Sequence, residues 1–453
     1  MFEVNINKIF NLLFHITLFV SYFYMSFPQL ITSIFRVSNG YIVLYILVFV
    51  IGVLMIFCNQ ERNKWVANYV YYAKKAKWLL LFFILYFIWD IINFLYAQNH
   101  AYIVEKYTFI LKMLALGCSV FIYVFEYNGN EQSYKRRLKN VFFNFGVIAV
   151  ILAISSTLCY YLGVMTRQDV RIAPTADYNN YAITILIGWV SLVMLLLYSE
   201  RNYLKKIIYF SLSSCICIPP IYLSASRRGV YILLLLIVIF LILSFVWVIK
   251  RKIYTDVKNM LCSIVFILIC IILIILQINL FYSYNEKQAI EGISTNERIE
   301  QDVESTAVGA RSDIWKCAIN NIKDFNIKQL IIGGGGSYSN DIYMNNSEYT
   351  NKLIKIYEND KDKVSKLDPH NFILNDLLEG GIVKAVLILM IAVNVFIALI
   401  KDIRREVCIS LLLMIIFMIL TLSLLVSAHY GIMWGRWTIV ISICTMCLKG
   451  IKA

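Results

Sequence analysis

Arginine side chains gather in three polar segments that separate long apolar runs of this chain. They are Arg167 and Arg171 before one apolar run, Arg227 and Arg228 at the start of another, and Arg311 in the long polar segment 283–370. A guanidinium group stays protonated and binds phosphate oxygens through two parallel hydrogen bonds. Convergence of the three segments would therefore create a site for a lipid phosphate or diphosphate. The alternative interpretation is that these arginines only extend toward lipid headgroups at a membrane surface.

A histidine lies where the sequence LDPHNFILNDLLEGG predicts the start of a helix. We expect Asp368 to be the N-cap and Pro369 the first helical residue, which places His370 in the first turn. The positive end of the helix dipole disfavours an imidazolium, so a neutral ring able to accept a proton is expected near neutral pH. Gly380 and Gly381 are expected to end the helix. A surface histidine in a helix cap is the alternative.

Two further features leave a structural and a functional interpretation open. The glycine run Gly333 to Gly336 permits a tight turn and a close approach of two backbones, or a flexible hinge. No Lys-Ser or Lys-Thr pair follows it, so it is not a nucleotide-binding P-loop. Asp90 is a charged residue inside an apolar run, where such residues are costly and often functional. A hydrogen bond between helices is the alternative for Asp90.

The cysteines predict no metal site and no intrachain disulfide. Of the eleven, only Cys317 lies in the long polar segment, and we expect it to be the one accessible thiol. The pairs Cys215/Cys217 and Cys444/Cys447 have spacings that resemble metal motifs. Both pairs lie in apolar runs without a nearby histidine, so small packing residues are the better interpretation.

The elements that must position these residues are membrane helices. The chain has 453 residues, of which 60% are hydrophobic and 15% are charged, and its mean hydropathy is +0.71. This composition excludes a soluble domain, a disordered chain and a coiled coil. Since a bilayer core takes about 20 apolar residues per helix, we predict an all-α, polytopic membrane protein with about twelve transmembrane helices. The predicted spans are 9–31, 40–58, 78–97, 107–126, 141–163, 180–198, 206–224, 229–249, 259–282, 382–400, 406–427 and 436–449.

Basic residues predict how these helices cross the membrane. Most lysines and arginines fall in alternate loops, which indicates that these loops and both chain ends are cytoplasmic. The formal net charge of +14 then comes mostly from basic residues in the cytoplasmic loops and does not indicate binding to nucleic acid. We predict transmembrane helices 1–9 in residues 1–282, an outer helical cap in 283–370, and transmembrane helices 10–12 in 371–453.

Five short motifs occur in a characteristic order between about residues 160 and 400. They are Arg171 with Asn179 and Asn180, the Ser-x-Ser-Arg sequence of Ser224, Ser226 and Arg227, the Arg-x-x-x-Trp sequence of Arg311 and Trp315, the glycine run, and His370 with Asn371, Leu374, Glu379 and Gly380. Each motif is loose, but the order and the common outer side are specific. The set resembles the O-antigen ligase and O-antigen polymerase (Wzy-type) superfamily.

The resemblance implies an integral membrane glycosyltransferase similar to the GT-C type. Such an enzyme transfers a glycan from a polyprenyl diphosphate carrier to a sugar hydroxyl and needs no cofactor, nucleotide sugar or metal. By motif, Arg171, Arg227 and Arg311 would bind the diphosphate, with Arg167 and Arg228 as alternatives to their neighbours. His370 would position or deprotonate the acceptor hydroxyl. The supporting residues would be Asn180, Ser226, Trp315, Asn371 and Glu379.

Within the superfamily we favour a polymerase of lipopolysaccharide biosynthesis over a ligase. The abundance of Ile, Asn, Lys and Tyr is typical of the AT-rich loci in which polymerases occur. The expected partners are lipid-linked oligosaccharide as donor and acceptor, membrane lipid, and a chain-length regulator as a candidate protein partner. The expected location is the bacterial inner membrane, with the active site on the periplasmic face. A flippase or another transporter is the alternative of a different class, although transporters carry polar groups near the membrane midplane, whereas here they crowd at the outer face.

Overall fold

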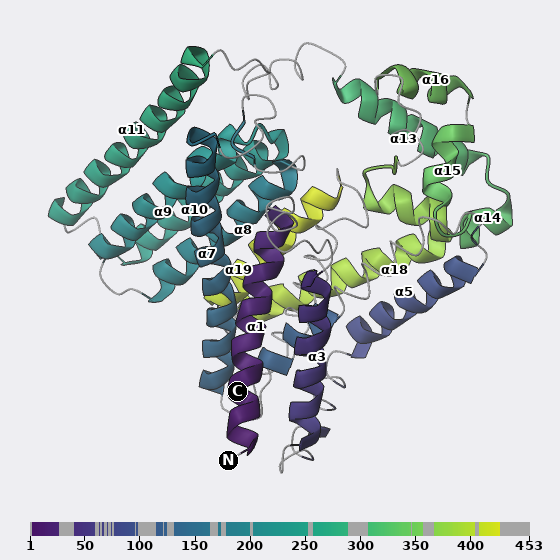
Figure 1. The fold of residues 1–453 in the computed structure, drawn as a ribbon, viewed down its shortest axis with the longest axis horizontal. Helices are drawn as coiled ribbons and strands as arrows, with labels where there is room; N and C mark the ends of the chain where they lie inside the picture. Colours follow the sequence, from purple (N-terminus) through teal and green to yellow (C-terminus); the bar gives the residue numbers. More distant parts are fainter. Residues whose placement is uncertain are drawn as a thin grey trace. The chain divides into compact units, whose positions relative to one another are not determined.

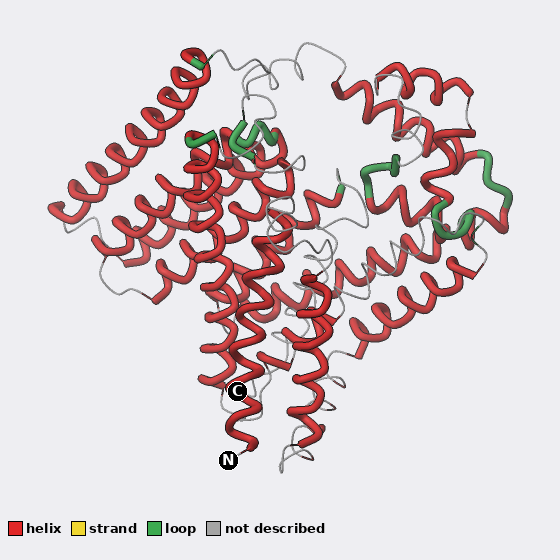
Figure 2. The backbone as a smooth tube through the Cα atoms, in the orientation of Figure 1, coloured by secondary structure: helices red, strands yellow, loops and turns green. Residues whose placement is uncertain are grey.

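The computed structural model is helical throughout most of the part of the chain that it describes (Figure 2). The described residues are 2–26, 40–58, 77–95, 115–120, 122–124, 131–163, 171–173, 178–199, 203–251, 257–288, 307–345, 347–356, 367–403 and 407–425, with the single residues 63, 66, 67, 70, 74 and 97. No strand occurs among them. The predicted all-α class is therefore confirmed for these residues.

The chain separates into two compact units. Unit 1 comprises Met1–Phe14, Ile42–Tyr134 and Gln301–Ala453, and unit 2 comprises His15–Tyr41 and Lys135–Glu300. This division follows packing, whereas the boundaries at 282 and 370 follow the predicted membrane topology and stay predictions. Helix α1 (Phe2–Ser26) crosses from unit 1 into unit 2, and α7 (Glu131–Tyr161) lies mostly in unit 2.

The remaining helices, labelled in Figure 1, are assigned to the units by the residue bounds given above. Unit 1 holds α3 (Gly40–Cys58) from Ile42 onward, α5 (Lys77–Leu95), α13 (Ala307–Lys323), α14 (Ile327–Ile332), α15 (Tyr338–Asn345), α16 (Ser347–Ile356), α18 (Phe372–Ile403) and α19 (Val407–Leu424). Unit 2 holds α8 (Tyr178–Ser199), α9 (Tyr203–Leu223), α10 (Arg227–Arg251) and α11 (Val257–Lys287).

Six of the described helices are long and apolar enough to cross a membrane. These stretches are Lys77–Leu95, Arg136–Tyr161, Tyr178–Leu196, Leu204–Leu223, Ile264–Lys287 and Phe372–Lys401. Each overlaps a predicted span, and together they support a polytopic membrane protein. The total of twelve spans stays a prediction. The span predicted at 436–449 lies outside the described residues, and the span at 107–126 is described only in part.

Lipid is the environment that explains the exposed surface of α11. Along the middle of this helix, the side chains of Leu268, Ile271, Ile272 and Leu276 are each about half exposed. Contact of such a face with water would be unfavourable, because the transfer of apolar surface out of water lowers the free energy. In a bilayer the same face is surrounded by hydrocarbon, as expected for a transmembrane helix.

The described part of the segment between α11 and α18 contains helices α13, α14, α15 and α16, with non-helical residues at 324–326 and 333–337. Helices α13, α15 and α16 share a small core that contains Ile314, Tyr343 and Leu353. Leu378 of α18 belongs to the same core, so these helices pack on the first part of α18. The location of this segment on the outer face of the membrane stays a prediction.

Helix α18 is broken at the end of its first third. Gly381 has a φ of +66° and a ψ of −165°, which a right-handed helix does not allow. The first part of the helix therefore ends at the Gly380–Gly381 pair, as predicted from the sequence. Helices α5 and α14 pack against α18 and lie beside it in Figure 1.

Candidate active site

The helix that follows His370 begins later than predicted from the sequence. Helix α18 starts at Phe372, and Oδ1 of Asn371 accepts hydrogen bonds from two backbone N–H groups of its first turn, at 3.0 and 3.1 Å. Asn371 is therefore the N-cap, and the predictions of Asp368 as N-cap, Pro369 as first helical residue and His370 in the first turn are wrong. The reason is the backbone of His370, whose φ of +46° is left-handed and cannot continue a right-handed helix.

Asp368 instead binds the histidine twice. Its Oδ1 accepts a hydrogen bond from the backbone N–H of His370 at 2.7 Å and lies 2.8 Å from the imidazole Nδ1. The imidazole is 31% exposed. Because a carboxylate accepts at this contact, Nδ1 of a neutral ring carries the hydrogen and Nε2 keeps its lone pair. Nε2 can then take a proton from a hydroxyl group.

Helix α13 brings the Arg-x-x-x-Trp motif to the same loop. The indole Nε1 of Trp315 donates a hydrogen bond to the carbonyl of Pro369 at 2.8 Å. Arg311 lies one helical turn before Trp315 and is partly buried. The amide of Asn340 on α15 donates to the carbonyl of Leu367 at 2.8 Å. Two motifs far apart in the sequence, Arg311/Trp315 and His370, are thus joined within unit 1.

The glycine run packs against the break in α18, which favours close approach over a hinge. The N–H groups of Gly334 and Gly335 donate to the carbonyls of Leu378 and Glu379 at 2.8 and 3.0 Å. Gly333 has a φ of +79°, and a Cβ there would lie 2.2 Å from the Glu379 carbonyl oxygen. Only glycine fits such a contact. The run therefore satisfies carbonyl groups at the end of the first part of α18.

Two other charged residues, one of which was not predicted as a site residue from the sequence, are buried at this break with Glu379. Its Oε1 accepts a hydrogen bond from the Ser339 hydroxyl at 2.8 Å, and its Oε2 lies 3.7 Å from Nζ of Lys384. Lys384 also lies 2.5 Å from Oδ1 of Asp90. Asp90 could be singled out from the sequence, because it is a charged residue inside an apolar run. Lys384 gave no signal, because a lysine at the edge of an apolar run is ordinary.

In unit 2, Arg171 lies on an aromatic ring and is held at the end of α9. Its guanidinium carbon is 4.7 Å from the centroid of the Tyr178 ring, and the residue is 8% exposed. The neighbouring Ile172 donates its backbone N–H to the carbonyl of Leu223 at 2.9 Å. The segment that carries Arg171 is thereby tied to the start of the Ser-x-Ser-Arg motif.

The Ser-x-Ser-Arg motif caps the N-terminus of α10, as expected for a motif at the start of a helix. Oγ of Ser226 accepts a hydrogen bond from the Gly229 N–H at 3.1 Å and donates one to Oδ1 of Asn179 at 2.8 Å. Oγ of Ser224 accepts from the Ser226 N–H at 3.2 Å. Ser226 therefore has the geometry of an N-cap and also joins α10 to the start of α8.

Two of the three predicted arginine segments thus meet within unit 2. Arg227 and Arg228 are the first two residues of α10, and both are partly buried. The hydrogen bonds of Ile172 and Ser226 connect their segment to that of Arg171. Asn180 is buried one residue beyond Asn179. Arg311 belongs to unit 1, and Arg167 lies outside the described residues.

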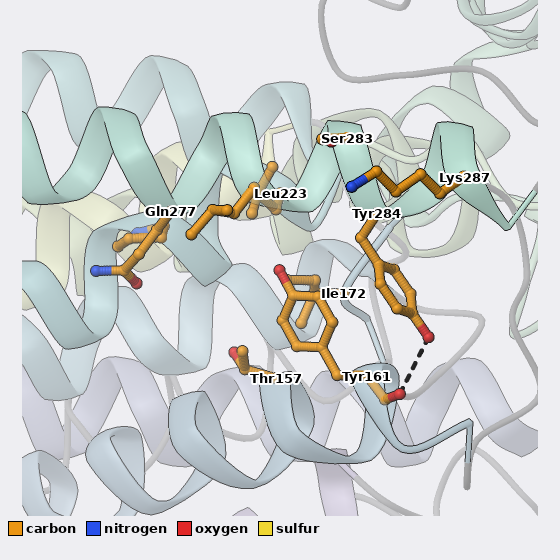
Figure 3. A pocket seen from close by; sticks show the side chains of 10 residues that line it. Thr157, Tyr161, Ile172, Leu223, Gln277, Ser283, Tyr284 and Lys287 are labelled. Atoms are coloured by element: carbon orange, nitrogen blue, oxygen red, sulfur yellow. Dashed lines mark hydrogen bonds between the residues drawn. The ribbon is translucent and has the colours of Figure 1, made fainter.

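A cavity of about 450 Å³ lies beside the Arg171 segment in unit 2 (Figure 3). Helices α7, α9 and α11 line it, and Ile172 and Leu223 contribute from the connection described above. The lining is mainly apolar, with Lys287 at the end of α11 as its charged member. The Tyr284 hydroxyl donates to the Tyr161 carbonyl at 3.0 Å. The cavity offers an apolar space next to the segment that carries a buried guanidinium.

Cys317 is not the accessible thiol predicted from the sequence. It is fully buried in the core of α13, α15 and α16, and burial raises the pKa of its thiol from 9.0 to about 11. We expect Cys317 to resist a water-soluble maleimide at pH 8, where little thiolate forms, and to react once the chain is unfolded in denaturant. Mass spectrometry of the peptide that contains Cys317 would check this. Rapid labelling of the folded protein would contradict the burial.

The side chains of these segments offer two kinds of chemistry. The Asp368–His370 pair can transfer a proton, and the arginines can bind an anion. Within the described residues, no group of three or more histidine, cysteine, aspartate or glutamate side chains has the geometry to hold a metal ion.

Comparison with known families gives one match. Residues 212–389 match the sequence profile of a family described as O-antigen ligase. The matched range contains Ser226, Arg227, Arg311 and His370, and it supports the predicted O-antigen ligase and polymerase superfamily. It does not separate a polymerase from a ligase. No curated protein matches the sequence.

Proposed function

We propose, with the O-antigen ligase match of residues 212–389 as the premise, that this chain is a membrane glycosyltransferase that polymerises a surface glycan. Its donor would be a glycan on a polyprenyl diphosphate, and its acceptor would be a hydroxyl at the non-reducing end of another lipid-linked repeat unit. The observation that carries the proposal is the Asp368–His370 pair, which lies in the matched range and orients an imidazole for proton transfer.

The proposed reaction is a displacement at the anomeric carbon of the donor sugar. The acceptor oxygen forms a bond to that carbon while the bond from carbon to the diphosphate oxygen breaks, and the electron pair leaves with the diphosphate. The acceptor proton passes to Nε2 of His370. Asp368 accepts from Nδ1 and stabilises the imidazolium that forms. No cofactor enters this balance.

The arginines would bind the diphosphate as negative charge develops on it. Arg171 and Arg227 are proposed for this role from the arrangement within unit 2, with Arg228 as the alternative to Arg227. Arg311 is proposed from its motif. Preorganised positive groups stabilise a transition state most where negative charge develops in a site shielded from water. The apolar cavity beside Ile172 would receive part of the isoprenoid chain.

A ligase that transfers the glycan to lipid A-core is the second candidate, and the description of the matched family favours it. Both reactions use the same donor and the same leaving group, so the residues discussed above would serve either. For both, we propose the bacterial inner membrane, with the site on its periplasmic face and both chain ends in the cytoplasm.

An assay of the purified protein with a single substrate distinguishes a polymerase from a ligase. We expect incubation with a polyprenyl-diphosphate-linked repeat unit from its own host to give a ladder of longer lipid-linked chains, resolved by gel electrophoresis. Transfer only after addition of a lipid A-core acceptor would show a ligase instead. Absence of both products with a verified substrate would contradict a glycosyltransferase and favour a transporter.

A further inference from the structure

A buried lysine in unit 1 faces three carboxyl groups across the break in α18. Nζ of Lys384 lies 2.5 Å from Asp90, 3.4 Å from Asp376 and 3.7 Å from Glu379, and all four side chains are buried. The lysine follows the break, whereas Asp376 and Glu379 precede it. The ammonium group therefore bridges the two parts of α18 and joins both to α5.

Four residues on one face of α5 contact the residues around the break in α18. The Tyr86 hydroxyl lies 3.1 and 3.2 Å from the two carboxylate oxygens of Asp376, and Trp89 donates to the Gly380 carbonyl at 2.8 Å. Asp90 contacts Lys384, and the Asn93 carbonyl accepts from Gly336 at 3.0 Å. Spacings of three and four residues place these residues on one face of the helix.

The first part of α18 is consequently fixed at both ends. Asn371 caps its beginning, and the charged residues and the glycine run hold its end. His370 precedes the cap by one residue. A buried ion pair has few alternative partners, and rupture leaves charges without compensation in an apolar surrounding. Such contacts restrict sliding and rotation of the short helix that carries the histidine loop.

We propose that Lys384, with Asp90, Asp376 and Glu379, is a positioning device that fixes the His370 imidazole for transfer. This inference rests on the proposed function of His370. The lysine acts through the first part of α18 and does not touch the substrate. A small misplacement of a reacting group lowers a rate strongly, by about 100-fold for 1 Å.

The test uses the full-length protein with the Asp90→Asn/Lys384→Met double variant, which removes one charge of each sign and leaves the net charge of the cluster unchanged. We expect normal accumulation in membranes and a kcat lower by about 10- to 100-fold, with the KM for the lipid-linked donor nearly unchanged. Added to His370→Ala, the double change should cause no further loss, because residues that act as a unit are not additive. Lys401→Met, at the exposed end of α18, is the matched control.

Hydrogen exchange tests the positioning without the reaction. Backbone amides of 372–380 should exchange at least about 10-fold faster in the double variant than in the wild type, while those of α13 stay unchanged. Unchanged exchange, an unchanged kcat, or a full additional loss on the His370→Ala background would each overturn the inference. Faster exchange in a protein whose wild type transfers no glycan would support the positioning and reject the proposed function. If the double variant does not accumulate, Asp90→Glu is measured by the same criteria.

Discussion

Replacement of His370 with alanine is expected to lower glycan transfer by about 100- to 10,000-fold, the range for loss of a general base. Nδ1 of the imidazole faces Asp368 at 2.8 Å. Nε2 is therefore the nitrogen that can take the proton from the acceptor hydroxyl. Helix α18 should form normally, since its cap is the side chain of Asn371. The measurement is the initial rate of chain lengthening by purified protein, compared at equal amounts of folded enzyme.

Two variants sharpen this result. Asp368→Asn keeps an oxygen for the His370 backbone N–H but removes the carboxylate charge, and we expect a smaller loss of about 10- to 100-fold. His15→Ala is the matched control, because His15 contacts Asn144 in unit 2 and has no proposed role in transfer. Full activity of His370→Ala would exclude this residue as the base and leave the acceptor to be activated by another group.

The six described helices that are long and apolar enough to cross a membrane were predictable from sequence, because each long apolar run has one stable environment. The start of α18 was not, since LDPHN offers two residue types that cap helices well, Asp368 and Asn371. The left-handed backbone of His370 decides between them. A φ angle of this kind depends on the whole loop, including the hydrogen bond from Trp315 to Pro369.

The site motifs were predictable as neighbours only where the spacing is local. Arg311 and Trp315 share a helix face by spacing alone, but the meeting of Trp315 with the histidine loop requires the fold. The glycine run allowed a hinge or a close contact, and the carbonyl of Glu379 settles this in favour of contact. Lys384 could not be recognised, because its three carboxyl partners come from two helices far apart in the sequence.

Replacement of Arg171 is the second change with a large expected effect. Arg171→Ala should lower the rate of transfer by about 100- to 1,000-fold, as loss of one preorganised group that stabilises developing negative charge does. Arg171→Lys should still lose about 10-fold, because lysine keeps the charge but not the planar pair of donors. The guanidinium also packs on Tyr178 at 4.7 Å, a contact that a lysine ammonium does not reproduce in shape.

The kinetics distinguish a role in binding the leaving group from a structural role. Loss of leaving-group stabilisation should lower kcat and kcat/KM together, and free diphosphate should inhibit the Arg171→Lys variant less than the wild type. Arg136→Lys, at an exposed position of α7, is the matched control and should retain wild-type kinetics. Arg311→Lys should behave like Arg171→Lys. If both variants left the glycan chain length in cells and the rate in vitro unchanged, the arginines would not bind the diphosphate, and the buried guanidinium of Arg171 would serve only to hold Tyr178 and the start of α8.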